Sequence, residues 1–217
     1  MTVAILGGTG LTGRFCLEQL LGTSKISKVV AIGRHKTGLT HEKLEEVMLI
    51  DNQMSQSVHA DAFISCVGTT IKKAGSEEAF KNVDFDLPVS IAKKLKQNGC
   101  QSAAIISAMG ADEKSLFFYN RTKGNLEIAM ERLEFRSLTI LRPSFIEGPR
   151  EEKRTGEAIA LSVFKILNPL LIGPFRHYRK VQADEIGAAL TKAVVAQKPG
   201  NTIYKSGDIK RLADLLV

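Results

Sequence analysis

Short apolar runs alternate with longer amphipathic stretches along most of the chain. The apolar runs predict strands at residues 3–6, 28–32, 47–50, 62–67, 103–107, 138–141 and 202–204. The stretches between them predict helices at residues 11–21, 76–98, 115–133, 155–167 and 184–196, with Pro88 as a break in the second. Strands that alternate with helices in this way are typical of a parallel sheet covered on both faces. The pattern therefore predicts an α/β fold with a doubly wound parallel sheet of about seven strands.

The least regular part of the chain is the segment 147–180, which contains Pro149, Pro169 and Pro174. We expect one domain over residues 1–217, because its length suits a single core. Within that domain the segment 147–180 follows the sixth predicted strand. It is expected to be a small C-terminal substrate-side insertion that covers a ligand.

A glycine-rich loop follows the first predicted strand and begins the first predicted helix. Its residues are Gly7, Gly8, Thr9, Gly10, Leu11, Thr12 and Gly13, which satisfy the pattern G-x-G-x-x-G. Glycines in this context allow a tight turn, a close approach of backbone to pyrophosphate and close packing of helix on strand. Arg14 and Phe15 follow where a P-loop requires lysine and a hydroxyl residue, so the loop predicts a Rossmann dinucleotide site and not a triphosphatase.

The residue after the second predicted strand indicates which dinucleotide is bound. NAD sites place an acidic residue there, about 20 residues after the glycines, whereas this chain has Arg34. A guanidinium can bind a 2′-phosphate through two charge-assisted hydrogen bonds, and Arg14 could add a second contact. The sequence therefore predicts NADP(H) as the cofactor.

Three side chains could carry catalysis near the nicotinamide. Ser107 ends the fifth predicted strand, at the sheet edge where α/β proteins bind ligands. Tyr119 and Lys123 are four residues apart, so they share one face of a helix. An ammonium near a phenol favours the phenolate, and a serine hydroxyl can orient a substrate oxygen.

Composition narrows the functional classes. The formal net charge is +7, but acids are interspersed with the basic residues, and we expect neither a nucleic-acid nor a membrane partner. No apolar stretch is long enough for a membrane span, and the N-terminus lacks the pattern of a signal peptide. Cys16, Cys66 and Cys100 lack metal-ligand spacing, which predicts no metal site and a reducing, cytoplasmic location.

The glycine loop with Ser107, Tyr119 and Lys123 resembles the atypical branch of the short-chain dehydrogenase/reductase superfamily. Further motifs resemble the Tat-interacting-protein-type oxidoreductases and their bacterial relatives; they are residues 68–70, 74–77, 83–86, 107–112, 119–124 and 142–144. The resemblance implies a Rossmann sheet, NADP(H) and a catalytic triad of Ser107, Tyr119 and Lys123. It also implies cofactor contacts from Gly68, Thr69, Lys123, Pro143 and Ser144, and pairing of two copies into a homodimer.

One position departs from that resemblance. Related extended enzymes often have an asparagine on the helix after the fourth strand, and the comparable residue here is Asp84, with Asn82 nearby. A proton relay through this helix is therefore not expected to follow the usual form.

The first functional hypothesis is an NADP(H)-dependent oxidoreductase acting on a small carbonyl or alcohol. The alternative is a non-enzymatic NADP(H)-binding redox sensor or regulator, because fold resemblance does not separate the two.

Overall fold

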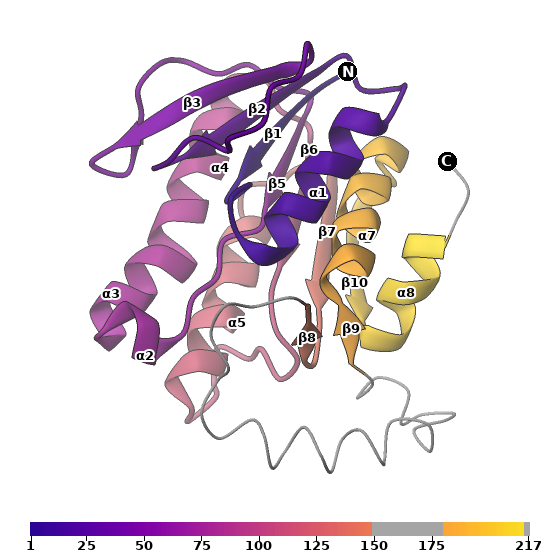
Figure 1. Ribbon diagram of the computed structural model, residues 1–217. Helices are drawn as coiled ribbons and strands as arrows, with labels where there is room; N and C mark the ends of the chain where they lie inside the picture. Colours follow the sequence, from indigo (N-terminus) through magenta and orange to yellow (C-terminus); the bar gives the residue numbers. More distant parts are fainter. Residues whose placement is uncertain (149–179, 215–217) are drawn as a thin grey trace.

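The computed structural model describes residues 1–148 and 180–214 (Figure 1). The predicted helix at 155–167 and most of the segment 147–180 lie outside the described residues. The main sheet has the order β10-β7-β6-β5-β1-β2-β3-β4. Its strands are β1 (Thr2–Leu6), β2 (Lys28–Gly33), β3 (Leu44–Ile50), β4 (Gln53–Met54), β5 (Ala62–Ser65), β6 (Ser102–Ile106), β7 (Ser137–Arg142) and β10 (Gly200–Lys205).

The predicted parallel sheet is confirmed. All seven predicted strands are present, and each pairs in parallel with its neighbours. The short strand β4, which the sequence did not predict, adds an antiparallel eighth strand beside β3. The strand order reverses at β1, which pairs with β2 on one side and β5 on the other. Open α/β sheets bind ligands at such a reversal, beyond the carboxyl ends of the strands.

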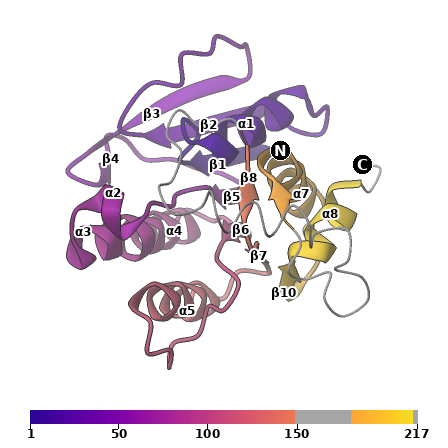
Figure 2. The same cartoon turned by 60° about the horizontal axis from the view of Figure 1, so that its bottom comes forward.

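Helices cover both faces of the sheet (Figure 2). One face carries α1 (Leu11–Gly22), α7 (Ala183–Ala196) and α8 (Ser206–Asp214), and the other carries α4 (Leu87–Gln97) and α5 (Phe118–Glu131). The short helices α2 (Ile71–Ala74) and α3 (Glu77–Lys81) precede α4. Of these elements, α2 and α8 were not predicted from the sequence.

Two apolar clusters form the core, one on each face of the sheet. Along β1, Val3 and Ile5 belong to the cluster under α1 and α7, whereas Ala4 and Leu6 belong to the cluster under α4 and α5. Successive side chains of a strand point to opposite faces, so a strand buried on both faces must be apolar throughout. This explains why the predicted strands appear in the sequence as continuous apolar runs.

The break predicted at Pro88 takes the form of a π-turn, η1 (Asn82–Asp86), between α3 and α4. The N–H of Leu87 donates to the carbonyl of Asn82, five residues earlier. Pro88 has no N–H and cannot donate to the carbonyl of Asp84, so the regular ladder of hydrogen bonds is interrupted at this point. Single π-turns of this kind are frequent at functional sites.

Two short strands bracket the segment that was predicted to be an insertion. The strands β8 (Ile146–Glu147) and β9 (Val181–Gln182) pair in parallel, which brings the two ends of this segment together. Both lie at the lower end of the sheet in Figure 1, where β7 ends. No helix within the described residues is long and apolar enough to cross a membrane.

Candidate functional site

The glycine loop connects β1 to α1 at the point where the strand order reverses. Gly7 has a φ of 87°, in the left-handed region that favours glycine. The N–H of Gly10 donates to the Gly7 carbonyl at 3.1 Å. A Cβ atom at Gly13 would lie 2.0 Å from the same carbonyl oxygen, so only glycine allows α1 to pack this closely on the loop. The loop thus has the tight turn and the close packing that a dinucleotide fingerprint requires.

The N-terminus of α1 is suited to a phosphate group. Its N-cap, Gly10, provides no side-chain hydrogen bond, and its first turn contains no acidic residue. The first N–H groups of a helix have no partner within the helix, and they lie at the positive end of its dipole. Of the other predicted contact residues, Thr9 is exposed, Leu11 is half-buried and Thr12 is buried. A pyrophosphate therefore fits the donors of this loop.

Arg34 follows directly after β2, which pairs with β1 on the side opposite to β5. Its side chain is exposed, and it forms no ion pair with any described residue. Three residues further along the same loop, Thr37 donates to Glu46 on β3 through its backbone N–H at 2.5 Å and its hydroxyl at 2.8 Å. These bonds tie the loop that carries Arg34 to the neighbouring strand and leave the Arg34 guanidinium open to an anion.

Ser107 extends β6, because its N–H donates to the carbonyl of Leu141 on β7 at 2.7 Å. Its hydroxyl is buried and has no hydrogen-bond partner among the described residues. Buried hydroxyls are normally hydrogen-bonded, so this one is a candidate ligand donor. The loop after β6 passes close to α5 at Gly124. A Cβ atom at Gly124 would lie within 2.4 Å of the backbone of Asp112 and Glu113 in that loop. Gly124 therefore allows the loop after β6 to lie against the helix of Tyr119 and Lys123.

Tyr119 lies in the first turn of α5 and is 36% exposed. Its ring packs against Phe80 of α3, with the ring centres 5.5 Å apart and an angle of 45° between the rings. Phe118 packs on the edge of the same Phe80 ring. The phenol hydroxyl forms no hydrogen bond within the described part of the chain. The aromatic contact therefore fixes the ring while the oxygen stays available to a substrate.

Lys123 is buried one turn further along α5. Its ammonium lies 2.7 Å from Oδ1 of Asp84, and the two side chains are 3% and 0% exposed. The other oxygen of Asp84 accepts the N–H of Thr69 at 2.8 Å. Among the described residues no hydrogen bond joins Lys123 to Tyr119 or Ser107. The ion pair with Asp84 was not predicted, although an aspartate on the apolar face of a helical stretch just before Pro88 is a usable signal.

The remaining predicted cofactor residues lie at the same edge of the sheet. Gly68 and Thr69 follow β5, and a Cβ atom at Gly68 would lie 3.7 Å from Asp84 Oδ1. Pro143 follows β7, and its carbonyl accepts the N–H of Met109 at 2.9 Å. The backbone N–H of Ser144 donates to the hydroxyl of Ser206 at 2.8 Å. The fold thus brings residues that are widely separated in the sequence to the carboxyl ends of β1, β5, β6 and β7.

The described residues contain no cluster of side chains that could hold a metal ion. The three cysteines are free thiols, with Cys16 and Cys100 buried and Cys66 half-buried. Burial raises the pKa of the Cys100 thiol to about 11, so this group is protonated at neutral pH. The Cys100 thiol therefore behaves as a small apolar side chain and not as a nucleophile.

Solved structures with the same fold include proteins that were determined in complex with NAD. MoeE5, solved in complex with UDP-glucose and NAD, matches 98% of this chain and 81% of its own with a TM-score of 0.68 and 12% identity. A putative NAD-dependent epimerase/dehydratase from Bacillus halodurans matches 100% of both chains with a TM-score of 0.67 and 16% identity. At this level of identity the likeness establishes the fold, which is that of the epimerases and short-chain dehydrogenases.

Sequence relatives are closer, although no protein-family model matches the chain. Protein HTATIP2 of Rattus norvegicus is 36% identical over 75% of this chain and 70% of its own. The mitochondrial protein FMP52 of Candida albicans is 34% identical over 75% of each chain. The FMP52 relatives are named mitochondrial, so the prediction of a cytoplasmic location is wrong. Identity at this level over most of both chains shows that the protein belongs to the family of HTATIP2 and FMP52, which has the NAD(P)-binding, epimerase-like Rossmann fold.

Proposed function

We propose that the chain binds NADP(H) at the glycine loop and is an oxidoreductase that interconverts a small carbonyl compound and its alcohol. The observation that carries the proposal is the buried hydroxyl of Ser107, which has no partner among the described residues. It lies at the same sheet edge as the glycine loop and the loop after β5. A polar atom left unpaired in this position is costly unless a ligand satisfies it.

The side chains at this edge divide the chemistry between them. Bound NADPH would supply a hydride to the carbonyl carbon. Ser107 donates a hydrogen bond that orients the substrate oxygen, and Tyr119 donates the proton that this oxygen requires as an alcohol. Lys123 binds the ribose next to the nicotinamide. Arg34 binds the 2′-phosphate at the other end of the cofactor.

One observation favours the alternative of a redox sensor or regulator. The ammonium of Lys123 is already paired with Asp84. A protein with this arrangement could bind NADP(H) tightly without turning over a carbonyl, and its partner would read the bound cofactor. Segment 147–180 as a substrate cover and pairing into a homodimer remain predictions in both cases.

The test is a screen of aldehydes and ketones with the purified protein at fixed NADPH, followed by the loss of NADPH absorbance. On any substrate found, Tyr119→Phe should lower turnover by about 10²-fold or more, and Ser107→Ala should also lower it. NADPH affinity should stay within about twofold, because neither side chain holds the dinucleotide. Tyr204→Phe on β10 is the matched control, since that ring packs on the core at the other face. Normal turnover by Tyr119→Phe would contradict the mechanism, whereas tight NADPH binding without any turnover in wild type would favour the regulator.

A further inference from the structure

A buried ion pair joins the helix of the proposed catalytic residues to the π-turn before α4. Lys123 and Asp84 are 3% and 0% exposed, and 2.7 Å separates Nζ from Oδ1. An ammonium at this depth without a counter-charge would carry a large desolvation cost. Asp84 supplies that counter-charge and fixes the direction in which Lys123 points.

The same carboxylate also holds the loop after β5. Its Oδ2 accepts the backbone N–H of Thr69 at 2.8 Å. Asp84 therefore contacts two separate parts of the proposed cofactor site, one on α5 and one at the end of β5. A single side chain that contacts both parts fixes their spacing.

The local backbone explains why an acidic residue faces inward here. Asp84 lies in the middle of the π-turn η1, which ends where Pro88 removes a hydrogen-bond donor. Asp86 belongs to the same turn but is exposed, and its carboxylate lies 3.5 Å from the ammonium of Lys81. The turn thus presents one aspartate to the interior and one to solvent, and only the first contacts the site.

We infer that Asp84 is a positioning residue, which holds the Lys123 ammonium and the Thr69 backbone at the nicotinamide end of the cofactor. The inference rests on the proposed NADP(H) function. The contact between Lys123 and Asp84 is an ion pair and does not use all three N–H donors of the ammonium, so Lys123 can also bind the ribose hydroxyls. Asp84 touches neither cofactor nor substrate in this assignment and acts through Lys123 and Thr69.

The test compares two ligands, NADPH and 2′,5′-ADP, which has the 2′-phosphate end but no nicotinamide. Asp84→Asn removes the counter-charge of Lys123 and keeps an oxygen that can accept the Thr69 N–H. By isothermal titration it should weaken NADPH at least about tenfold, or about 1.4 kcal/mol, and leave 2′,5′-ADP within about twofold. Asp86→Asn, in the same turn, should change neither affinity. An Asp84→Asn variant that loses both ligands equally, or neither, would overturn the inference.

A double-mutant comparison covers the case in which Asp84→Asn alone does not fold. Lys123→Met should weaken NADPH, and adding Asp84→Asn to it should cause no further loss, because the two residues act as one unit. Additional weakening of NADPH in the double variant would show that Asp84 does not act through Lys123. If wild type binds neither NADPH nor 2′,5′-ADP, the proposed function fails and the inference fails with it. If wild type binds both NADPH and 2′,5′-ADP, an unexpected result with the Asp84 variants counts against the inference alone and not against the proposed function.

Discussion

The carboxylate of Glu127 accepts two hydrogen bonds from the guanidinium of Arg142, one from Nε at 2.9 Å and one from a terminal nitrogen. The pair joins α5, one turn after Lys123, to the end of β7. It also raises the pKa of the Arg142 guanidinium, chiefly through these hydrogen bonds. A raised pKa means that the stabilisation is present at every pH below the ordinary pKa of an arginine side chain, so it does not vary across the neutral range.

Breaking this pair should destabilise the fold. The two side chains are only 25% and 6% exposed, so Glu127→Gln leaves a cation largely desolvated without its partner. We expect the free energy of unfolding to fall by about 2 kcal/mol in urea denaturation. The exposed pair of Arg14 and Glu18 is the control, and Glu18→Gln should cost less than about 0.5 kcal/mol. Equal losses of unfolding free energy in the two variants would show that the pair of Arg142 and Glu127 stabilises the fold no more than an exposed ion pair does.

Gly13 can be tested by adding one methyl group. A Cβ atom there would lie 2.0 Å from the backbone oxygen of Gly7, so Gly13→Ala must displace the loop or the helix. We expect a loss of about 1–3 kcal/mol in stability and a clear loss of NADPH affinity. Gly22, at the other end of α1, has nothing within 4 Å of the added atom. Gly22→Ala should therefore be neutral or stabilise by up to about 1 kcal/mol, with unchanged NADPH affinity.

Gly10 separates binding from folding in the same loop. A Cβ atom at Gly10 meets only the Gly7 carbonyl oxygen, at 3.4 Å, so a larger residue should be tolerated by the fold. Gly10→Val would however occupy the space of the pyrophosphate and should abolish NADPH binding. Thermal unfolding close to that of wild type with no heat of NADPH binding is the expected result. A folded Gly10→Val variant that binds NADPH normally would mean that the loop is not the site.

Acid should weaken the attachment of the Arg34 loop to β3. The backbone N–H of Thr37, and then its hydroxyl, lower the pKa of Glu46 below 4.5. A lowered pKa gives stability that is present above the ordinary value and is lost as the pH falls through the value in the folded protein. The difference in free energy of unfolding between wild type and Glu46→Gln should therefore shrink as the pH falls below about 4.5.

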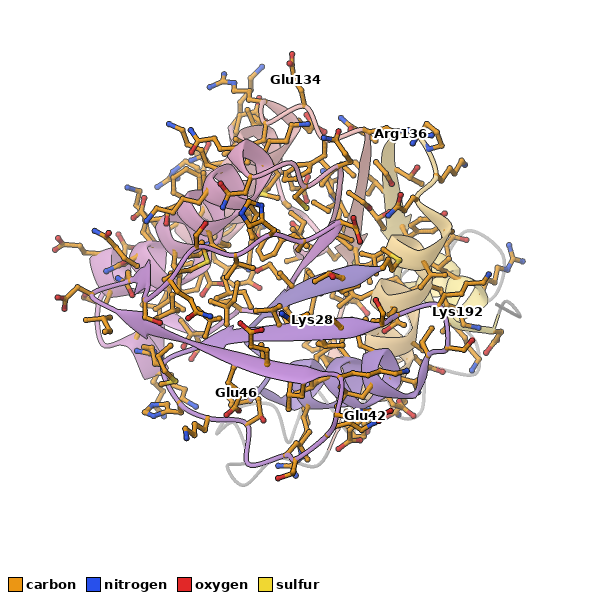
Figure 3. All side chains as sticks on the ribbon, turned by 90° about the horizontal axis from the view of Figure 1, so that it is seen from above. Lys28, Glu42, Glu46, Glu134, Arg136 and Lys192 are labelled. Atoms are coloured by element: carbon orange, nitrogen blue, oxygen red, sulfur yellow. The ribbon has the colours of Figure 1, made fainter. Side chains whose placement is uncertain are left out.

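The control for this experiment is Glu42→Gln, in the exposed stretch just before β3; both glutamates are labelled in Figure 3. Glu42 accepts no hydrogen bond from the described residues. Its replacement should leave the acid dependence of unfolding the same as in wild type. A difference between wild type and Glu46→Gln that stays constant with pH would contradict the account of Glu46.

The sequence was sufficient to predict the features that depend on residues close to one another along the chain. The apolar run 3–6 and the glycines after it predict a strand and a turn, and the spacing of Tyr119 and Lys123 places both on one helix face. The partner of Lys123 was not predictable in the same way. Its identity depends on how α5 packs beside the π-turn of Asp84, 39 positions earlier in the numbering of the sequence.

Other features that were missed also depend on distant contacts. The strands β8 and β9 are each two residues long, and they exist only because they pair with each other across the intervening segment. Ser206 accepts a hydrogen bond from Ser144, 62 residues earlier. Short elements of this kind have too few residues for a recognisable period, and packing alone stabilises them.

In the proposed function, the glycine loop and Arg34 together form an NADP(H) site. Its most direct test is isothermal titration of the wild-type protein with NADPH and with NADH. NADPH should bind at least about tenfold more tightly, a difference of about 1.4 kcal/mol, and Arg34→Asp should reverse the preference. Equal affinity of wild type for the two cofactors, or binding of neither, would contradict the claim.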